Sequence, residues 1–377
     1  MPVTYRDQGR KRSLVLVHGL SGEESWRPLL DQLMVLPELE GWDIHAFGYV
    51  TRWLPRWLRY RLVSAPDLAR LANVFATYCQ SNLSRYRNLA VLGHSAGGLI
   101  ALDALLRYDW LRERTTHLAL LGAPVGGVGA ARLLGPVSPQ FRDLTRGSRF
   151  LLDLQRRLDT EPLPRSYALR VVAGTDDTTL LMPSVFAHFH ESVQRTVPGD
   201  HVSMIQPTGP DATIVRVIVD LLTSPRIFLS YVREDQDAVI KVFDALQARE
   251  LLPWMDQRRL EPGEIWHASI MEALRSSDRF LVFLSPTSSA ELKRDGVFLQ
   301  EVETAIGIQD ERGEPSPFVI PVRLPDLNDS DIPPQLARYQ MFDLSHRGSD
   351  DLAHFLETTT AGSTVAAARV APEGCVG

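Results

Sequence analysis

Short apolar runs alternate with longer segments of helical periodicity along the first half of the chain. The apolar runs predict strands at residues 13–18, 42–48, 88–92, 117–121, 168–173 and 192–197. The periodic segments predict helices at residues 66–84, 97–106 and 212–222. Strands that alternate with helices are typical of a mostly parallel sheet flanked by helices, so we predict an α/β fold.

The same alternation restarts after Ser224-Pro225. Further strands are predicted at residues 226–231, 251–255, 279–284, 317–322 and 340–343, with helices at 235–249, 266–276, 296–308 and 350–358. We therefore expect one domain at residues 1–223, a second at 224–360 and a disordered tail at 361–377. Within the first domain, residues 124–165 mix glycine, proline and short apolar pieces after a predicted strand, where α/β enzymes carry a lid or cap.

Charge divides the chain at the same place. Residues 1–225 hold 25 Lys and Arg against 21 Asp and Glu, whereas residues 226–377 hold 15 against 25. The whole chain has a formal net charge of −6, which argues against a nucleic-acid partner. The asymmetry supports two separately folded units.

Several other classes of protein are disfavoured. Charged residues interrupt the apolar runs before any reaches the ~20 residues that a membrane helix needs, and the first twenty residues have no secretory pattern. Cys79 and Cys375 form neither a disulfide framework nor a metal site. We therefore expect a cytoplasmic protein without a metal or a bound cofactor.

The pentapeptide Gly93-His94-Ser95-Ala96-Gly97 lies between a predicted strand and a predicted helix. A serine on such a strand-to-helix turn is exposed as a nucleophile, and the helix N-terminus offers N–H groups to an oxyanion. A glycine-rich turn that merely contains a serine is the structural alternative.

A serine nucleophile needs a base and an orienting carboxylate. His201 follows the last predicted strand and precedes the last helix of this half, which suits a general base better than His94, His188 or His190. Asp176 and Asp177 both follow the strand at 168–173. We favour Asp177, because the apolar Leu180 lies three positions later, and keep Asp176 as the alternative.

The loop at residues 18–22 supplies the second half of the expected oxyanion hole. We assign its two amides to Ala96 and Leu20, with a plain tight turn at His18-Gly19 as the alternative. Together, the Leu14–Leu20 segment, the serine pentapeptide and Gly199-Asp200-His201 resemble the α/β-hydrolase family, in its lipase-like branch, over residues 12–223. The resemblance implies hydrolysis of a small-molecule ester, thioester or lipid through an acyl-enzyme.

One segment of this half interleaves aromatic residues with arginines, from Trp53 to Leu62. Such a segment suits a membrane interface or the flank of an acyl channel. A core-facing connection with its arginines reaching solvent is the favoured reading, and a membrane surface is the less favoured partner.

The second half carries a different series of motifs. A strand ends in Ser230-Tyr231 and is followed by Arg233, another strand ends at Asp256, and a third ends in Ser285-Pro286 before a helix that carries Glu301. This series resembles the TIR (Toll/interleukin-1 receptor) family over residues 225–345, and so implies a flavodoxin-like domain with a five-stranded parallel sheet.

The resemblance also implies two roles for TIR domains, as scaffolds or as enzymes that cleave NAD at the nicotinamide–ribose bond. Glu301 matches the family's carboxylate, which would stabilise the oxocarbenium-like ribose, with a surface glutamate as the alternative. Ser230, Arg233, Asp256 and Trp266 are the expected NAD-binding residues, with NAD as substrate; Trp266 is alternatively a core anchor. Residues 288–297 lack the family's usual tryptophan.

Three functions follow from these motifs. The favoured hypothesis is a bacterial-type defence or stress effector that combines a serine esterase with a TIR domain that cleaves NAD on self-association through the loop at residues 257–263. In the second hypothesis the TIR domain is a non-catalytic assembly or sensing module that regulates an esterase or lipase. In the third, both domains are non-catalytic scaffolds.

Overall fold

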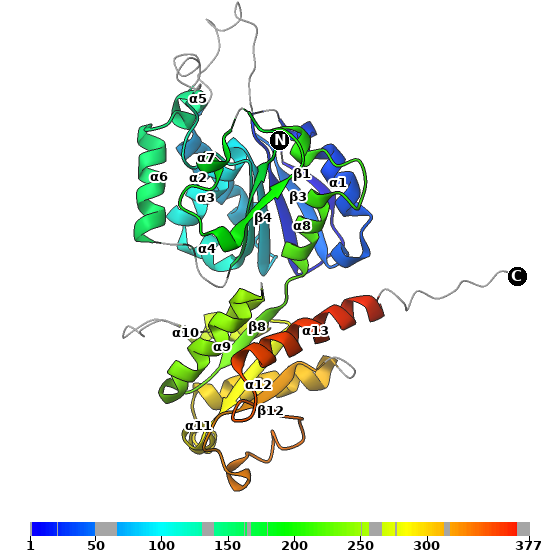
Figure 1. The fold of residues 1–377 in the computed structure, drawn as a ribbon, viewed down its shortest axis with the longest axis vertical. Helices are drawn as coiled ribbons and strands as arrows, with labels where there is room; N and C mark the ends of the chain where they lie inside the picture. Colours follow the sequence, from blue (N-terminus) through cyan, green and yellow to red (C-terminus); the bar gives the residue numbers. More distant parts are fainter. Residues whose placement is uncertain are drawn as a thin grey trace, which may run out of the picture. The chain divides into compact units, whose positions relative to one another are not determined.

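The computed structural model describes residues 2–20, 22–49, 66–129, 139–161, 163, 167–178, 180–249, 251–255, 266–275, 277–312 and 317–367. The chain forms two compact units, Met1–Thr223 (unit 1) and Ser224–Gly377 (unit 2). Each unit contains one sheet with helices on both faces (Figure 1). Within the described residues, no helix combines the length and apolar character needed to cross a bilayer.

Unit 1 is built on a seven-stranded sheet in the order β1-β3-β2-β4-β5-β6-β7. The strands are β1 (Val3–Arg6), β2 (Arg12–Val17), β3 (Trp42–Phe47), β4 (Asn88–His94), β5 (Thr115–Leu121), β6 (Ala168–Gly174) and β7 (Gln194–Val197). Strand β1 is antiparallel to β3, and the other neighbours are parallel. This mostly parallel sheet has the α/β-hydrolase architecture.

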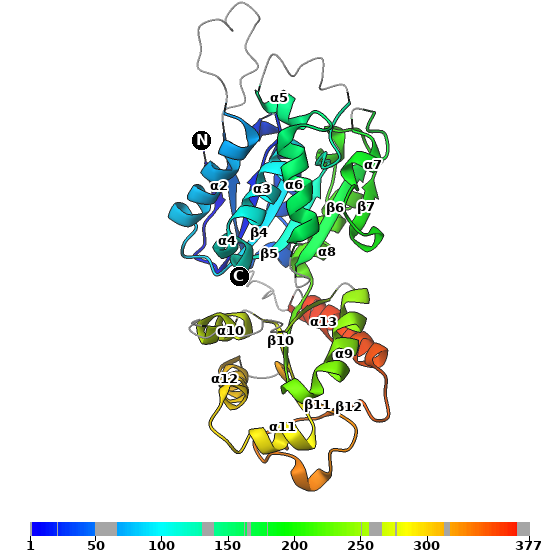
Figure 2. The ribbon, with the colours of Figure 1, turned by 90° about the vertical axis from the view of Figure 1, so that its left-hand side faces the viewer.

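Helices cover both faces of this sheet. They are α1 (Arg27–Met34), α2 (Leu68–Asn82), α3 (Ala96–Arg107), α4 (Asp109–Arg114), α5 (Pro139–Leu144), α6 (Arg149–Thr160), α7 (Met182–Val185) and α8 (Thr213–Thr223). Helices α2, α3 and α6 lie on one face, and α1 and α8 on the other (Figures 1 and 2).

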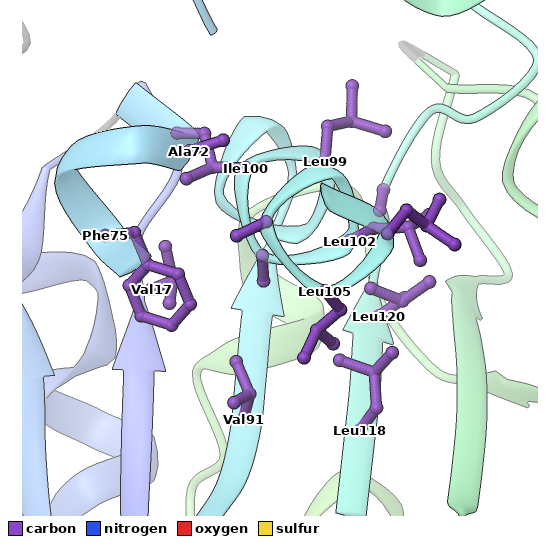
Figure 3. Close-up of a cluster of buried hydrophobic side chains, with 14 of the residues drawn as sticks. Val17, Ala72, Phe75, Val91, Leu99, Ile100, Leu102, Leu105, Leu118 and Leu120 are labelled. Carbon is purple, nitrogen blue, oxygen red and sulfur yellow. The ribbon is translucent and has the colours of Figure 1, made fainter. Parts of the chain in front are cut away.

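The core of unit 1 follows from the two-residue repeat of its strands. Val15 and Val17 of β2 pack with α2 and α3, and Val91 of β4 and Leu118 of β5 belong to the same cluster (Figure 3). Helix α3 is buried from Ala96 to Leu106, because helices pack on both sides of it as well as the sheet beneath it. The helix that follows the serine turn is therefore held rigidly.

The structure adds details to the expectations for unit 1. Strand β1 was not predicted, because Val3–Arg6 is short and pairs only at the edge of the sheet. Within residues 124–165, Leu151 and Leu154 of α6 are fully buried, and the Gln155 side chain donates to the Val125 carbonyl at 2.7 Å. The lid or cap expected over this region stays a prediction. The segment from Trp53 to Leu62 lies outside the described residues.

Unit 2 has five parallel strands in the order β12-β11-β10-β8-β9. They are β8 (Arg226–Ser230), β9 (Leu252–Trp254), β10 (Arg279–Leu284), β11 (Val319–Arg323) and β12 (Phe342–Asp343). In chain order this is the 2-1-3-4-5 arrangement of flavodoxin-like sheets. The predicted five-stranded parallel sheet is confirmed.

The helices of unit 2 divide between the two faces of its sheet. They are α9 (Gln236–Ala248), α10 (Trp266–Arg275), α11 (Pro286–Glu291), α12 (Val297–Arg312) and α13 (Ser349–Ala367). Helices α9 and α13 pack on one face, and α10 and α12 on the other (Figure 2). Helix α13 extends beyond the predicted start of the tail at residue 361, and residues 368–377 lie outside the described residues.

Candidate active sites

The turn between β4 and α3 holds Ser95 in a rare backbone conformation, with φ 55° and ψ −126°. Non-glycine residues seldom occupy this region, and the turn needs small neighbours. A Cβ atom built on Gly97 would lie 2.2 Å from the Val17 carbonyl oxygen, so only glycine fits there. The sequence thus forces the serine onto a sharp elbow at the carboxyl end of the sheet.

Ser95 and His201 are joined by a hydrogen bond. The His201 Nε2 atom lies 2.9 Å from the Ser95 Oγ atom, although the two residues are 106 positions apart in the chain. Both side chains lie at the carboxyl ends of strands, since Ser95 follows β4 and His201 follows β7. The imidazole is therefore placed to take the hydroxyl proton.

Asp177, and not Asp176, completes this chain of hydrogen bonds. The Asp177 Oδ2 atom lies 3.0 Å from His201 Nδ1, and its Oδ1 atom accepts the Leu180 N–H at 2.7 Å. Asp176 is exposed and accepts from the Gly199 N–H at 3.3 Å. Because a carboxylate only accepts, His201 carries its proton on Nδ1 and presents the bare Nε2 to Ser95.

The loop that carries His201 is shaped by Asp200. Its carboxylate accepts the N–H groups of Val202 and Ser203 at 2.9 and 2.8 Å and the Ser203 hydroxyl at 2.8 Å. These hydrogen bonds, above all the one from the Ser203 backbone, lower the pKa of Asp200. The charged carboxylate thus fixes the turn on which the imidazole stands.

The two expected oxyanion-hole residues, Ala96 and Leu20, both belong to segments that lie next to Ser95. Ala96 is the first residue of α3, in the helical turn whose N–H groups have no carbonyl partner within the helix. Leu20 directly follows Gly19, which lies very close to Ser95. A Cβ atom built on Gly19 would be only 2.8 Å from the Cβ atom of Ser95. The loop after β2 therefore reaches the nucleophile directly.

The second cluster of polar side chains lies where the strand order of unit 2 reverses, between β8 and β10. Such switch points leave a crevice at the carboxyl ends of the strands, where ligands bind in open α/β sheets. Ser230 ends β8, and its hydroxyl donates to the Glu301 Oε2 atom at 2.5 Å. Both residues are buried, so α12 directs this carboxylate inward.

A second serine–carboxylate pair borders the same switch point. The Ser285 hydroxyl, directly after β10, donates to Asp235 Oδ2 at 2.8 Å, and burial raises the pKa of Asp235. Glu303, two residues further along α12, lies on another face of the helix and is exposed. Two carboxylates therefore approach the carboxyl ends of neighbouring strands.

Of the remaining expected NAD-binding residues, the structure describes the side chain of Arg233 alone. Arg233 lies in the 3-10 helix Arg233–Asp235, three residues after Ser230, and its side chain is exposed. Trp266 opens α10, with only its backbone described, and Asp256 lies outside the described residues, as do residues 257–263.

Comparison with known families decides the identity of unit 2. Residues 227–358 match the family model described as TIR domain. Unit 2 is a TIR domain. A solved TIR domain of the Toll-related receptor TRR-2 from Hydra magnipapillata is similar to 36% of this chain and 97% of its own, at 20% identity and a TM-score of 0.28.

Solved lipases are similar to unit 1. The mature lipase BlEst2 from Bacillus licheniformis is 15% identical over 55% of this chain and 93% of its own, with a TM-score of 0.41. Phospholipase PlaB from Legionella pneumophila is 15% identical over 56% and 59%, with a TM-score of 0.44. A search of the curated proteins finds no match. The α/β-hydrolase architecture of unit 1 is evident from its strand order and serine elbow.

Three residues near the hydrolase site contribute to its geometry although the sequence analysis gave them no role. His94 Nε2 lies 2.8 Å from the His201 carbonyl oxygen, to which it donates. A Cβ atom on Gly122, where φ is 57°, would lie 3.2 Å from His201 Nδ1. Tyr49 binds His18 through its N–H and its hydroxyl. The glycine directly after a predicted strand was the only visible signal.

Proposed function

We propose that the α/β-hydrolase unit is a serine hydrolase of carboxylic esters or thioesters. The observation that carries this proposal is the continuous hydrogen-bonded chain from Ser95 through His201 to Asp177. A hydroxyl on a strained turn, a base at its oxygen and a buried carboxylate behind the base form the arrangement that acyl transfer needs.

The reaction uses each group in turn. Ser95 Oγ attacks the ester carbonyl carbon while its proton passes to His201 Nε2, and the Ala96 and Leu20 amides stabilise the tetrahedral oxyanion. His201 then returns the proton to the departing alcohol or thiol, which leaves an acyl-enzyme on Ser95. A water molecule activated by the same imidazole releases the acid and restores the serine.

An apolar acyl group suits the surroundings of this site. Leu181, Met182 and Val202 are large apolar side chains with relative exposures of 63%, 40% and 40%, on the segments that follow β6 and β7. Exposed apolar side chains on the loops around a catalytic group support contact with an apolar substrate. We therefore favour lipid esters and acyl thioesters as the substrate class.

The test of this proposal is hydrolysis of p-nitrophenyl esters of increasing chain length by the full chain. We expect turnover that rises from acetate to medium-chain esters and disappears in Ser95→Ala. Asp176→Asn is the matched control, because this exposed carboxylate does not contact His201. Equal hydrolysis by Ser95→Ala and the wild type would exclude the proposal.

For the TIR domain we infer a second activity, cleavage of NAD at the nicotinamide–ribose bond. The supporting observation is the buried carboxylate of Glu301, held by Ser230 at the switch point of the sheet. A carboxylate beside the ribose stabilises the oxocarbenium-like transition state, as in glycosidases. A non-catalytic assembly module that regulates the esterase is the alternative, and the role in defence or stress stays a prediction.

Consumption of NAD by purified full chain distinguishes these two roles. We expect loss of NAD that increases more steeply than in proportion to protein concentration, because the resemblance implies self-association. Glu301→Gln is expected to abolish it, while Glu303→Gln, an exposed change on the same helix, leaves it intact. If NAD stays intact at every concentration while ester hydrolysis persists, the assembly role is favoured.

A further inference from the structure

The peptide unit that joins Gly19 to Leu20 is held by its carbonyl group. His18 Nδ1 lies 2.7 Å from the Gly19 carbonyl oxygen, and the Gly22 N–H donates to the same oxygen at 3.3 Å. The C=O and N–H of a trans peptide lie in one plane and point in opposite directions. Two donors on the carbonyl therefore also fix the direction of the Leu20 N–H.

The orientation and tautomer of the His18 ring are determined by its partners. A carbonyl can only accept, so Nδ1 carries the proton, and Nε2 then accepts the Tyr49 N–H at 3.1 Å. The Tyr49 hydroxyl donates to the His18 carbonyl at 2.7 Å, and the two rings stack at 4.2 Å with an angle of 11° between them. The imidazole has one position and one proton arrangement.

The fixed peptide lies against the nucleophile. Gly19 approaches Ser95 so closely that a Cβ atom on Gly19 would lie 2.8 Å from Ser95 Cβ. A Cβ atom on Gly97 would lie 2.4 Å from the His18 carbonyl oxygen, which shows that the same loop rests on the start of α3. His18 is therefore next to both expected oxyanion donors, and its own ring stacks on Tyr49.

We propose that His18 is the positioning residue of the oxyanion hole: its Nδ1–H holds the Gly19 carbonyl so that the Leu20 N–H faces the oxygen of a substrate attached to Ser95. This inference rests on the serine hydrolase function proposed above. Burial lowers the pKa of His18, so the ring is neutral at pH 7 and keeps Nε2 free of a proton for the Tyr49 N–H.

Two amide substitutions separate the two hydrogen bonds of this ring. The side-chain nitrogen of His18→Asn is as many bonds from the backbone as Nδ1, so it can donate to the Gly19 carbonyl. The amide of His18→Gln corresponds in position to Nε2, so it can meet the Tyr49 N–H but not the Gly19 carbonyl. We expect H18Q to lose about 100-fold in kcat, the effect of one oxyanion donor, with KM little changed. H18N is expected to retain most of the activity.

A thionoester of the same acyl group provides the readout specific to the oxyanion hole. Sulfur is a weak hydrogen-bond acceptor, so a developing thiolate gains little from the two amides. The wild type should therefore prefer the oxygen ester strongly, and this preference should shrink in H18Q and survive in H18N. His18→Leu, which removes both hydrogen bonds, is measured in parallel and should behave like H18Q.

The outcomes are distinguishable. Equal losses on oxygen ester and thionoester in H18Q and H18L would show a merely structural role for His18, and full activity in both variants would also overturn the inference. Absence of ester turnover and of Ser95 labelling in the wild type would instead refute the serine hydrolase itself. Thermal unfolding of each variant identifies losses of activity that come from unfolding.

Discussion

A hydrogen bond from the His94 ring to the His201 backbone, and a contact between the two rings, join His94 to His201. The His94 Nε2–H donates to the His201 carbonyl at 2.8 Å, and the ring centroids lie 4.9 Å apart. Burial, with a smaller effect from His201, lowers the pKa of His94 to about 3. His94 thus stays neutral while His201 exchanges protons with the reacting serine, so the support of the base does not change during the reaction.

This lowered pKa predicts a dependence of stability on pH. In the unfolded chain a histidine titrates near 6.5, so between about pH 6.5 and 3 the unfolded state takes up a proton that folded His94 refuses. The free energy of unfolding should therefore fall with decreasing pH, by up to about 1.4 kcal/mol per pH unit for this residue. Burial lowers the pKa values of His18 and His45 as well, which adds to the slope.

Denaturant unfolding at pH 7, 6 and 5 measures this slope. His94→Gln keeps a donor for the His201 carbonyl but has no titrating group, so its slope should be smaller than that of the wild type. The carboxyls of buried Asp103 and half-buried Asp143, whose pKa values are raised by burial, act in the opposite direction but equally in both proteins. Identical slopes would contradict the assignment of a neutral, buried His94.

The two adjacent aspartates should differ greatly in their effect on ester hydrolysis. Asp177→Asn removes the carboxylate that keeps the His201 proton on Nδ1, and a change of this kind costs about 10⁴-fold in kcat. Asp176→Asn changes an exposed carboxylate that accepts from the Gly199 N–H and the Thr175 hydroxyl, and kcat should change little. Steady-state kinetics on one ester tests both, and a larger loss in Asp176→Asn would show that the triad is wrongly assigned.

Because Gly122 has no side chain, the His201 ring can lie against its backbone. In Gly122→Ala the new methyl group would meet His201 Nδ1 at 3.2 Å, and a left-handed backbone with φ 57° disfavours alanine by about 1 kcal/mol. We expect lower kcat together with slightly lower stability. Gly129→Ala is the matched control, since a Cβ atom there meets nothing within 4 Å; similar losses in both variants would refute the role of Gly122.

Ser230 should matter for NAD cleavage through its hydrogen bond to Glu301. Ser230→Ala removes the donor that orients the carboxylate, so NAD turnover should fall by about tenfold, roughly the 1.4 kcal/mol of a hydrogen bond to a charged group. Ser230→Thr keeps the hydroxyl and should retain more activity. An NAD assay in which Ser230→Ala matches the wild type would show that this contact is only structural.

The strands and the serine elbow could be predicted because their signals are local. The apolar run Leu89–Leu92 leads directly into Gly93, Ser95 and Gly97, and each signal lies within a few residues of the chain. The choice between Asp176 and Asp177 could not be settled in this way, since both follow the same strand and only the three-dimensional contact with His201 separates them.

The residues that support His201 could not be predicted from the sequence, for a related reason. Gly122 and His94 act on His201 across distances of about 80 and 107 positions in the chain, and no spacing rule connects them. In the TIR domain, the order of motifs predicted the sheet, but the pairing of Ser230 with Glu301 depends on how α12 crosses the end of β8. Asp256 stays a prediction.

Covalent labelling by a fluorophosphonate tests the central claim most directly, because this probe reacts with a serine only when a base and an oxyanion hole activate it. Peptide mapping of the labelled full chain should place one phosphonyl group on Ser95, lost in Ser95→Ala and in His201→Ala and retained in Asp176→Asn. An unlabelled Ser95 in the folded wild-type protein, or labelling that persists in His201→Ala, would contradict a nucleophile activated by His201.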